Sequence, residues 1–190
     1  MDKAMAKQSY KFDPHKPVLA IMGGSQGSVP LNRHFENHYK HYTNSNVQIL
    51  WQCGKNDHPR LKALSANKNL HIIPFTENMN SFYSAADVIV SRAGALALSE
   101  MSYLGKAMVL IPFPHSAGDH QYRNAKTFSN SGAALLITQS ELNTETLENT
   151  VLNLINNPDI IGKMEEKSRE MGISNATEII TQTIMEIARS

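Results

Sequence analysis

The sequence predicts a doubly wound α/β fold, a Rossmann-like parallel sheet of about six strands, and three observations support this prediction. Short apolar or β-branched runs alternate with segments of helical periodicity. The runs are continuously apolar, which is typical of parallel strands covered on both faces. After residue 144 the pattern is helical only. The expected strands span residues 18–22, 47–53, 70–74, 87–91, 107–111 and 134–137.

Helical segments separate these runs and close the chain. Leu31, Phe35, Tyr39 and Tyr42 recur every three or four residues, as on one face of a helix. The stretches TLENTVLNLINN, DIIGKMEEKSREMG and ATEIITQTIMEIARS follow the last strand, with breaks at Asn157-Pro158 and Gly172. We therefore expect helices from these stretches to cap the sheet.

Composition limits the classes of function. A chain of 190 residues, 41% of them hydrophobic, suits one domain, which we place at residues 17–190, with residues 1–16 as a linker. The net charge of +1 provides no overall field for nucleic acid. The single Cys53 excludes an internal disulfide and is expected in the core. No apolar run is long enough to span a membrane, so we expect a water-soluble chain.

The first candidate loop is MGGSQGS, directly after the first strand. Parallel sheets of this class bind ligands beyond the carboxyl ends of their strands. Gly24 and Gly27 allow a close backbone approach, and free N–H groups at the next helix start favour an anion such as phosphate. The spacing is neither G-x-G-x-x-G nor a Gly-Lys-Ser/Thr phosphate loop. A tight turn without a ligand remains the alternative.

The second candidate loop, SRAGALALSE, follows the fourth strand. Gly94 permits the turn, and Ala95 and Ala97 leave room for a ligand at the helix start. Glu100 could accept hydrogen bonds from two ribose hydroxyls, or it could be an ordinary helix carboxylate. Arg92 could bind phosphate, with a structural salt bridge as the alternative.

The third candidate loop, IPFPHSAGDHQYRNA, follows the fifth strand. Asp119 is a plausible helix N-cap, with His120, Gln121 and Asn124 on the first turn, where they could bind sugar hydroxyls. His115 and His120 lack a third ligand at a metal-binding spacing. The chain also contains no G-x-S-x-G nucleophile elbow, so we expect neither a metal site nor a serine hydrolase.

Taken in order, GGSQG, SRAGALALSE and PFPHSAGDHQYRNA closely resemble the C-terminal half of the MurG family, which has the two-domain GT-B architecture of glycosyltransferase family 28. The resemblance extends from about Lys16 to the C-terminal helices and includes PFTENMNSFYSAADVIV. Family members transfer N-acetylglucosamine (GlcNAc) from UDP-GlcNAc to lipid I, forming lipid II in peptidoglycan synthesis. The resemblance thus implies the donor-binding half of an inverting glycosyltransferase.

The resemblance also implies roles for individual residues. The first loop would face the diphosphate or sugar, Glu100 would hold the ribose, and Gln121, with His120 and Asn124, would contact GlcNAc. One departure is Ala97, which stands where family members often carry a hydroxyl residue. The donor-binding residues implied are Gly24, Ser25, Gln26, Gly27, Phe75, Thr76, Met79, Arg92, Gly94, Ala95, Leu96, Ala97, Glu100, His120, Gln121 and Asn124.

The resemblance implies UDP-GlcNAc as substrate and no tightly bound cofactor or metal. In the family, the catalytic base and the lipid I site belong to an N-terminal domain, and none precedes Lys16. We therefore expect no catalytic residue in this chain, and little or no transfer by it alone. The full-length protein would lie on the cytoplasmic, inner face of the bacterial cell membrane.

Three other classes of protein are alternatives to this interpretation. The chain could be the donor-binding subunit of a two-protein UDP-GlcNAc transferase with a separate membrane partner that acts on a polyprenyl-linked sugar. A dinucleotide-binding oxidoreductase is disfavoured by the glycine spacing and by Cys53-Gly54-Lys55, where an acidic residue would end the second strand. A non-enzymatic interaction module would leave three polar loops at one sheet edge without a purpose.

Overall fold

The computed structural model describes residues 1–142, 144–172 and 176–188. One six-stranded sheet forms its centre, in the order β3-β2-β1-β4-β5-β6, and all five neighbouring pairs are parallel. The predicted fold class and all six expected strands are therefore confirmed. The strands are β1 (Val18–Met22), β2 (Gln48–Gln52), β3 (Leu70–Ile73), β4 (Val88–Ser91), β5 (Met108–Leu110) and β6 (Ala134–Leu136).

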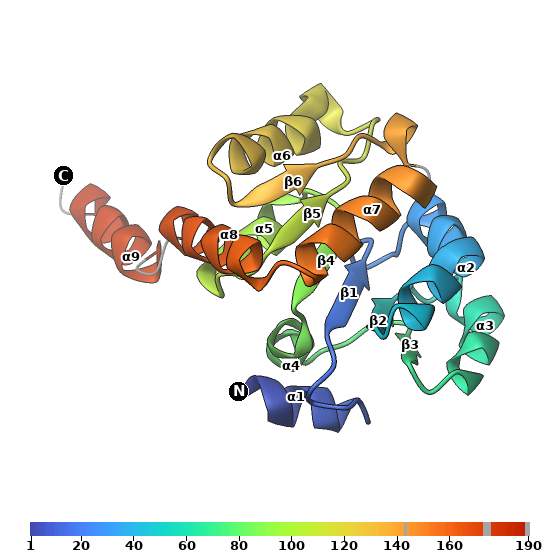
Figure 1. Cartoon of the computed structure of the whole chain (residues 1–190). Helices are drawn as coiled ribbons and strands as arrows, with labels where there is room; N and C mark the ends of the chain where they lie inside the picture. Colours follow the sequence, from blue (N-terminus) through green and yellow to red (C-terminus); the bar gives the residue numbers. More distant parts are fainter. Residues whose placement is uncertain (143, 173–175, 189–190) are drawn as a thin grey trace.

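Helices connect the strands and cover both faces of the sheet (Figure 1). Three short 3-10 helices, η1 (Lys62–Ala66), η2 (Ala117–Asp119) and η3 (Gln139–Glu141), lie in the connections. The α-helices are α1 (Lys3–Ser9), α2 (Val29–Asn44), α3 (His58–Leu61), α4 (Met79–Ala85), α5 (Ala95–Tyr103), α6 (His120–Asn130), α7 (Thr144–Ile155), α8 (Pro158–Met171) and α9 (Ala176–Ile187).

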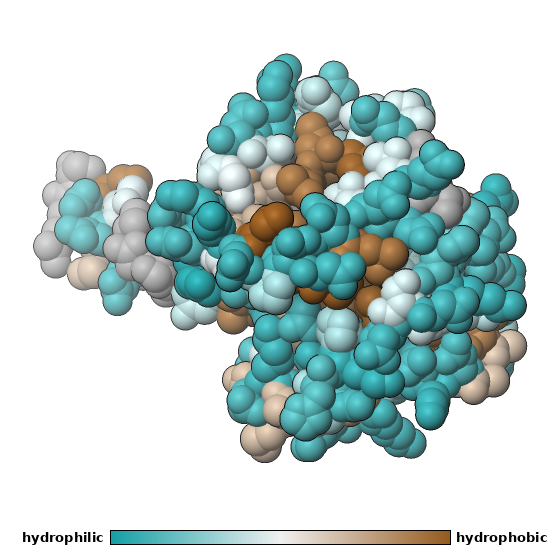
Figure 2. All heavy atoms as spheres, viewed as in Figure 1, coloured by the Kyte–Doolittle hydropathy of each residue, from teal (hydrophilic) through white to brown (hydrophobic). Residues whose placement is uncertain are grey.

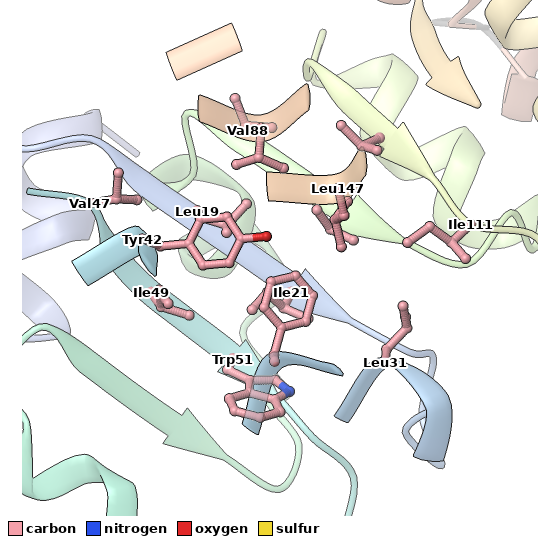
Figure 3. Packing of buried hydrophobic residues seen from close by; sticks show 14 of the residues in the cluster. Leu19, Ile21, Leu31, Tyr42, Val47, Ile49, Trp51, Val88, Ile111 and Leu147 are labelled. Atoms are coloured by element: carbon pink, nitrogen blue, oxygen red, sulfur yellow. The ribbon is translucent and has the colours of Figure 1, made fainter. Parts of the chain in front are cut away.

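The buried side chains form one cluster on each face of the sheet. Leu19 and Ile21 of β1 pack on one face with side chains from α2 and α7 (Figure 3). Val18, Ala20 and Met22 pack on the other face with side chains from α4, α5 and α6. Every residue of β1 is buried, which explains why this strand is continuously apolar in the sequence.

The first sixteen residues differ from the expected linker because part of them forms helix α1, which packs on α4. Ala6 and Phe12 are buried in the α4 face of the core. Lys7 Nζ lies 2.7 Å from Asp87 Oδ2, and this ion pair attaches α1 to the segment that precedes β4. The N-terminal segment therefore belongs to the folded unit.

The C-terminal helices cover the sheet only in part. Leu147, Val151 and Leu154 of α7 and Met164 of α8 are core residues, as expected for helices that cap the sheet. In contrast, the described side chains of α9 are exposed and add nothing to the core. Figure 2 shows mostly hydrophilic residues on the face with α7 and α8, and hydrophobic residues exposed over the β6 edge. No helix in the described ranges has the length and apolar character needed to cross a membrane.

The strand order places a topological switch point between β1 and β4. The chain leaves β1 toward β2 on one side and later returns to place β4 on its other side. In such sheets the connections diverge at this point and leave a crevice beyond the carboxyl ends of the strands. The loops after β1 and β4 therefore flank the expected ligand position.

Candidate functional site

A pocket of about 520 Å³ lies at this switch point. The loops after β1, β4 and β5 all contribute to its wall, so the three polar loops expected to converge do meet. This volume is within the usual range of small-molecule sites. The lining residues are Gly23, Gly24, Gly27, Ser28, Val29, Pro30, Ser91, Arg92, Gly94, Ala97, Phe113 and Gln121.

The loop after β1 is a glycine turn whose backbone faces the pocket. Gly24 has φ +88° with open space where a Cβ would stand, and Gly27 has φ +80°. A Cβ on Gly27 would collide with the carbonyl oxygen of Cys53, so this position requires glycine. Ser25 and Gln26 are exposed in this turn and do not line the pocket.

Two helix N-termini meet at the pocket, and neither has a side-chain cap. Ser28 is the N-cap of α2 and Gly94 is the N-cap of α5. The first intrahelical bonds start at Asn32 N and Leu98 N. Among the described residues, the earlier N–H groups of both helices have no acceptor. Such N–H groups and the positive ends of two helix dipoles favour an anion.

Arg92 lies under the pocket, 7% exposed, and holds three loops together. Its Nε and Nη2 donate to Ser28 Oγ at 3.2 and 2.8 Å, which explains why this hydroxyl does not cap α2. Its Nη1 donates to the carbonyls of Ile111 and Pro112, both at 3.0 Å, and its Nη2 donates to Gln139 Oε1 at 2.7 Å. All five N–H donors are thus used by the protein.

The charge of Arg92 has no carboxylate partner among the described residues, so the salt bridge weighed for it is not formed. Burial lowers the pKa of Arg92 to about 10, which still leaves it charged at neutral pH. The guanidinium carbon lies 5.7 Å from the centroid of the Phe113 ring. Arg92 therefore provides a positive potential beneath the pocket, and it does so without a free donor for a ligand.

The predicted residues of the third loop separate in the structure. Gln121 lines the pocket, and its Oε1 accepts a hydrogen bond from Phe113 N at 3.0 Å. Asn124 Nδ2 donates to the carbonyl of Ala93 at 3.2 Å, and Asn124 lines a neighbouring hollow with Ala95. His120 is exposed, with its Nδ1 near the carbonyl of Ala117. Only Gln121 of the three faces the pocket with the glycine loops.

The residues expected near ribose and uracil lie outside the pocket lining. Glu100 Oε2 accepts a hydrogen bond from Tyr83 Oη at 2.9 Å, so α5 and α4 are joined there. Met79 is the first residue of α4, one turn before Tyr83, and is therefore on the same side of that helix. Phe75 is 42% exposed and Leu96 is 76% exposed.

A residue absent from the sequence predictions connects this segment to the pocket. Gln52, at the end of β2, accepts a hydrogen bond from Thr76 N at 3.1 Å through Oε1. Its Nε2 donates to the carbonyl of Gly24 at 3.4 Å. The buried Gln52 side chain therefore links the glycine turn to the Phe75 segment.

Comparison with protein families identifies the fold's relatives. The family model described as the glycosyltransferase family 28 C-terminal domain matches residues 18–183. The chain belongs to glycosyltransferase family 28. The match covers the whole sheet and helices α2 to α8, and it includes the three loops of the pocket.

Several curated relatives of this family 28 domain are named UDP-N-acetylglucosamine--N-acetylmuramyl-(pentapeptide) pyrophosphoryl-undecaprenol N-acetylglucosamine transferase. The one from Chlorobium luteolum is 35% identical over 189 residues, which is 98% of this chain and 51% of the relative. The one from Cytophaga hutchinsonii is 37% identical over 179 residues, 94% of this chain and 48% of the relative. The chain thus spans about half the length of these relatives.

A solved structure gives the same result. The crystal structure of Acinetobacter baumannii MurG matches with a TM-score of 0.76 and 31% identity, over 90% of this chain and 52% of that chain. This similarity confirms the resemblance to the C-terminal half of the MurG family and the GT-B relationship expected from the sequence.

The pocket residues that sequence reasoning missed in this family 28 domain include Ser28 and Phe113, and Gln52 behind the loop was missed as well. Ser28 directly follows the last glycine of the turn, so its position at a helix start was a usable signal. Phe113 and Gln52 gave none, because an aromatic residue in a loop and a glutamine at a strand end occur in many folds.

The described residues provide neither a reactive cysteine nor a metal site. Cys53 is buried, and burial raises the pKa of its thiol to about 11, so it is not a nucleophile at neutral pH. Among the described residues, no three His, Cys, Asp or Glu side chains are grouped so that they could hold a metal ion.

Proposed function

We propose that this domain binds UDP-GlcNAc as the donor half of a glycosyltransferase. The observation that carries the proposal is the meeting of two uncapped helix N-termini, those of α2 and α5, above the buried charge of Arg92. A diphosphate supplies the anion that this arrangement favours. Gly24 and Gly27 allow its oxygens to approach the backbone.

The nucleoside would extend from the diphosphate toward α4. In the proposed complex, Phe75, Thr76 and Met79 border the uracil, and Glu100 accepts hydrogen bonds from the ribose hydroxyls. The contact between Glu100 and Tyr83 supports this placement, since it orients one carboxylate oxygen and leaves the other for a ligand. The bridge through Gln52 supports it as well, because it connects the Phe75 segment to the glycine turn.

The sugar would lie beside Gln121, whose amide nitrogen remains a donor after its oxygen has bonded Phe113 N. In the proposed reaction, an acceptor hydroxyl attacks the anomeric carbon and the bond to the diphosphate breaks. Negative charge grows on the leaving UDP, where the helix N-termini and Arg92 stabilise it. The general base that takes the hydroxyl proton would come from another domain.

The activity of the complete enzyme is proposed from the names of its relatives. Their names describe transfer of N-acetylglucosamine to an N-acetylmuramyl-(pentapeptide) pyrophosphoryl-undecaprenol, and this chain spans about half their length. We infer that an N-terminal acceptor domain completes the active site, and that the complete enzyme works in peptidoglycan synthesis at the inner face of the membrane. In this proposal the donor domain alone binds nucleotide and transfers little or no sugar.

Calorimetric titration of the purified chain tests donor binding. We expect saturable binding of UDP and UDP-GlcNAc and no heat from NADH. Glu100→Ala should weaken UDP by about 1.5–3 kcal/mol through loss of charge-assisted ribose bonds. Tyr83→Phe is the matched control, because it removes the same hydrogen bond to Glu100 and leaves the carboxylate in place. Unchanged UDP affinity in a folded Glu100→Ala variant would remove Glu100 from the site.

A turnover assay with lipid I tests whether sugar transfer needs a separate acceptor domain. The isolated chain should bind UDP-GlcNAc and form no measurable lipid II. Turnover by the purified chain at a rate comparable with that of a two-domain relative would refute the need for a separate acceptor domain.

A further inference from the structure

Gln52 is a buried amide that holds two loops of the proposed donor site at once. It is the last residue of β2 and is 2% exposed. Its Oε1 accepts a hydrogen bond from Thr76 N at 3.1 Å, and its Nε2 donates to the carbonyl of Gly24 at 3.4 Å. The two amide atoms cannot be exchanged, because a backbone N–H only donates and a carbonyl only accepts. One side chain therefore joins the turn after β1 to the segment after β3.

The bond to Thr76 fixes the direction of a main-chain acceptor. Thr76 N and the carbonyl of Phe75 belong to one trans peptide group, in which the N–H and the C=O point in opposite directions. Since the N–H points at Gln52, the Phe75 carbonyl points away from it. This carbonyl accepts no hydrogen bond from the residues that the structure describes. Phe75 is exposed, so a free acceptor is presented where the nucleoside is proposed to lie.

The bond to Gly24 has the opposite consequence in the glycine turn. The Gly24 carbonyl also accepts a hydrogen bond from Gly27 N at 3.1 Å, which closes the turn. Because this carbonyl points toward Gln52, the N–H of Ser25 in the same peptide group points away from it. Ser25 N has no acceptor in the described part of the chain. Gln52 thus supports a free N–H on the diphosphate side and a free C=O on the base side.

These two main-chain groups are complementary to different parts of a nucleoside diphosphate. A phosphate oxygen accepts a hydrogen bond from an N–H, whereas a carbonyl accepts one from a ring N–H of the base. Uracil has a hydrogen on N3, and cytosine has a lone pair on the same atom. A carbonyl that is held toward the base therefore pairs with uracil, and it leaves two acceptors facing each other when cytosine binds.

We propose that Gln52 is the positioning residue that gives the donor site its preference for uracil over cytosine. The inference rests on the proposed donor function, because it concerns the base bound at that same site. Gln52 acts through the peptide group of Phe75 and Thr76, not by contact with the nucleotide. Its bond to Thr76 N is shorter than its bond to the Gly24 carbonyl, so the base preference should depend on Gln52 more than diphosphate binding does.

A second glutamine on the same strand provides a matched control. Gln48 is the first residue of β2 and is also 2% exposed. Its Oε1 accepts a hydrogen bond from Asp13 N at 2.7 Å, and its Nε2 donates to the carbonyl of Asp13 at 2.9 Å. Gln48 thus makes two bonds to the backbone as Gln52 does, but at the amino edge of the sheet. Loss of either side chain should lower stability, and only loss of Gln52 should change the choice of base.

Calorimetric titration of the whole chain with UDP and with CDP measures this preference. The wild type should bind UDP about tenfold more tightly than CDP, as expected for one hydrogen bond to the base. Gln52→Met keeps the length of the side chain and removes both bonds, so most of the preference should be lost. Gln52→Glu keeps an oxygen that accepts from Thr76 N, so the preference should remain even where both nucleotides bind more weakly. Gln48→Met should leave the preference intact.

The outcomes separate this role of Gln52 from the donor function. If the wild type binds UDP and CDP equally, or if folded Gln52→Met keeps the preference, the role of Gln52 is disproved and the donor function stands. Loss of the preference in Gln48→Met as well would attribute it to general destabilisation and overturn the role too. Gln52→Asn, whose amide is one methylene too short to keep both bonds, repeats the test if the methionine variant does not fold. If UDP fails to bind the folded wild type, the donor function falls, and the role of Gln52 falls with it.

Discussion

Lys7 at one edge of the sheet and Arg92 at the other are both buried cations, and their charges are partnered in opposite ways. At the amino edge, Lys7 Nζ lies 2.7 Å from Asp87 Oδ2 and also donates to the carbonyl of Lys16 at 2.7 Å. At the carboxyl edge, Arg92 donates only to neutral acceptors. One charge is neutralised inside the fold, and the other is left uncompensated.

Asp87 compensates the charge of Lys7 at the amino edge. It accepts hydrogen bonds from Lys7, Lys3 and the backbone N of Val18. Burial by itself would raise the pKa of Asp87, but the hydrogen bonds from Lys7 and Lys3 hold it below its usual value. The ion pair therefore joins α1, β1 and the start of β4 in one structural contact.

A charge that only supports the fold, as at Lys7, differs from a charge that is available to a ligand, as at Arg92. A buried ion with a partner of opposite sign contributes to the fold and has little field left over. A buried guanidinium held by neutral groups keeps its field, and here that field reaches a pocket that already has two helix N-termini. The missing counter-charge at Arg92 is the diphosphate in our proposal.

The largest expected effect comes from breaking the neutralised edge. Asp87→Ala leaves Lys7 buried without its anion and should lower the free energy of unfolding by about 3–5 kcal/mol. Urea denaturation measures this loss. UDP affinity of the folded fraction should not change, because Asp87 lies at the opposite edge of the sheet. A loss of less than about 1 kcal/mol would mean that the pair of Lys7 and Asp87 contributes no more to stability than an exposed ion pair.

The next effect concerns His34, a buried side chain that needs no counter-charge because it is neutral. His34 is 8% exposed, and its Nε2 has no partner in the part of the chain that the structure describes. Burial, with a contribution from His38, lowers the pKa of His34 from 6.5 to about 4. The unfolded state therefore takes up a proton first as the pH falls.

Stability from His34 should be fully present above pH 6.5 and should decrease as the pH falls to about 4, by on the order of 3 kcal/mol. Urea denaturation from pH 7.5 to 4.5 measures this dependence in the wild type and in His34→Gln. The variant should show a flatter profile across the same range. Identical profiles would show that the pKa of His34 is the same in the folded and the unfolded chain.

Arg92→Met tests the uncompensated edge. Loss of the field should weaken UDP by on the order of 2 kcal/mol, about thirtyfold, which is the scale expected for a charge close to the diphosphate at an intermediate dielectric constant. Calorimetry with UDP and with uridine separates charge from shape, because uridine has no diphosphate. If both ligands weaken equally, Arg92 acts by holding the loops and not by its charge.

The smallest effect comes from the exposed partner of Asp87. Lys3 Nζ lies 2.9 Å from Asp87 Oδ1, but its side chain is 46% exposed. Lys3→Ala should therefore cost only about 0.2–1 kcal/mol, and the loss should shrink in high salt. The same denaturation series compares it with Asp87→Ala. A loss equal to that of the Asp87 variant would show that the neutralisation depends on Lys3 as much as on Lys7.

The sheet and the loops were predictable because their signals are local. Continuous apolar runs mark buried parallel strands, and all six expected runs became strands. Glycines such as Gly24 and Gly94 mark the turns after β1 and β4, and both line the pocket. The helix within residues 1–16 was not predicted because α1 has few apolar residues. It is attached to the sheet through Lys7 and Asp87, which are 80 positions apart in the sequence.

The site was predictable only in part. The glycine turns, Arg92, Ala97 and Gln121 reach the pocket, as expected for residues next to a strand end. Asn124 instead bonds the backbone of Ala93, and Glu100 bonds Tyr83, and sequence spacing contains no information on such partners. Whether the residues outside the pocket lining join the donor site stays a prediction for the titrations to test.

The sequence by itself determined the fold class, the positions of the strands and the glycine turns, because these follow from periodicity and backbone freedom within a few residues. Only the tertiary structure decided that β4 lies beside β1, that Arg92 has no carboxylate partner among the described residues, and that the loops after β5 and β6 line one pocket. The physical reason is that charge compensation and concavity depend on groups far apart in the chain, which only the folded sheet brings together.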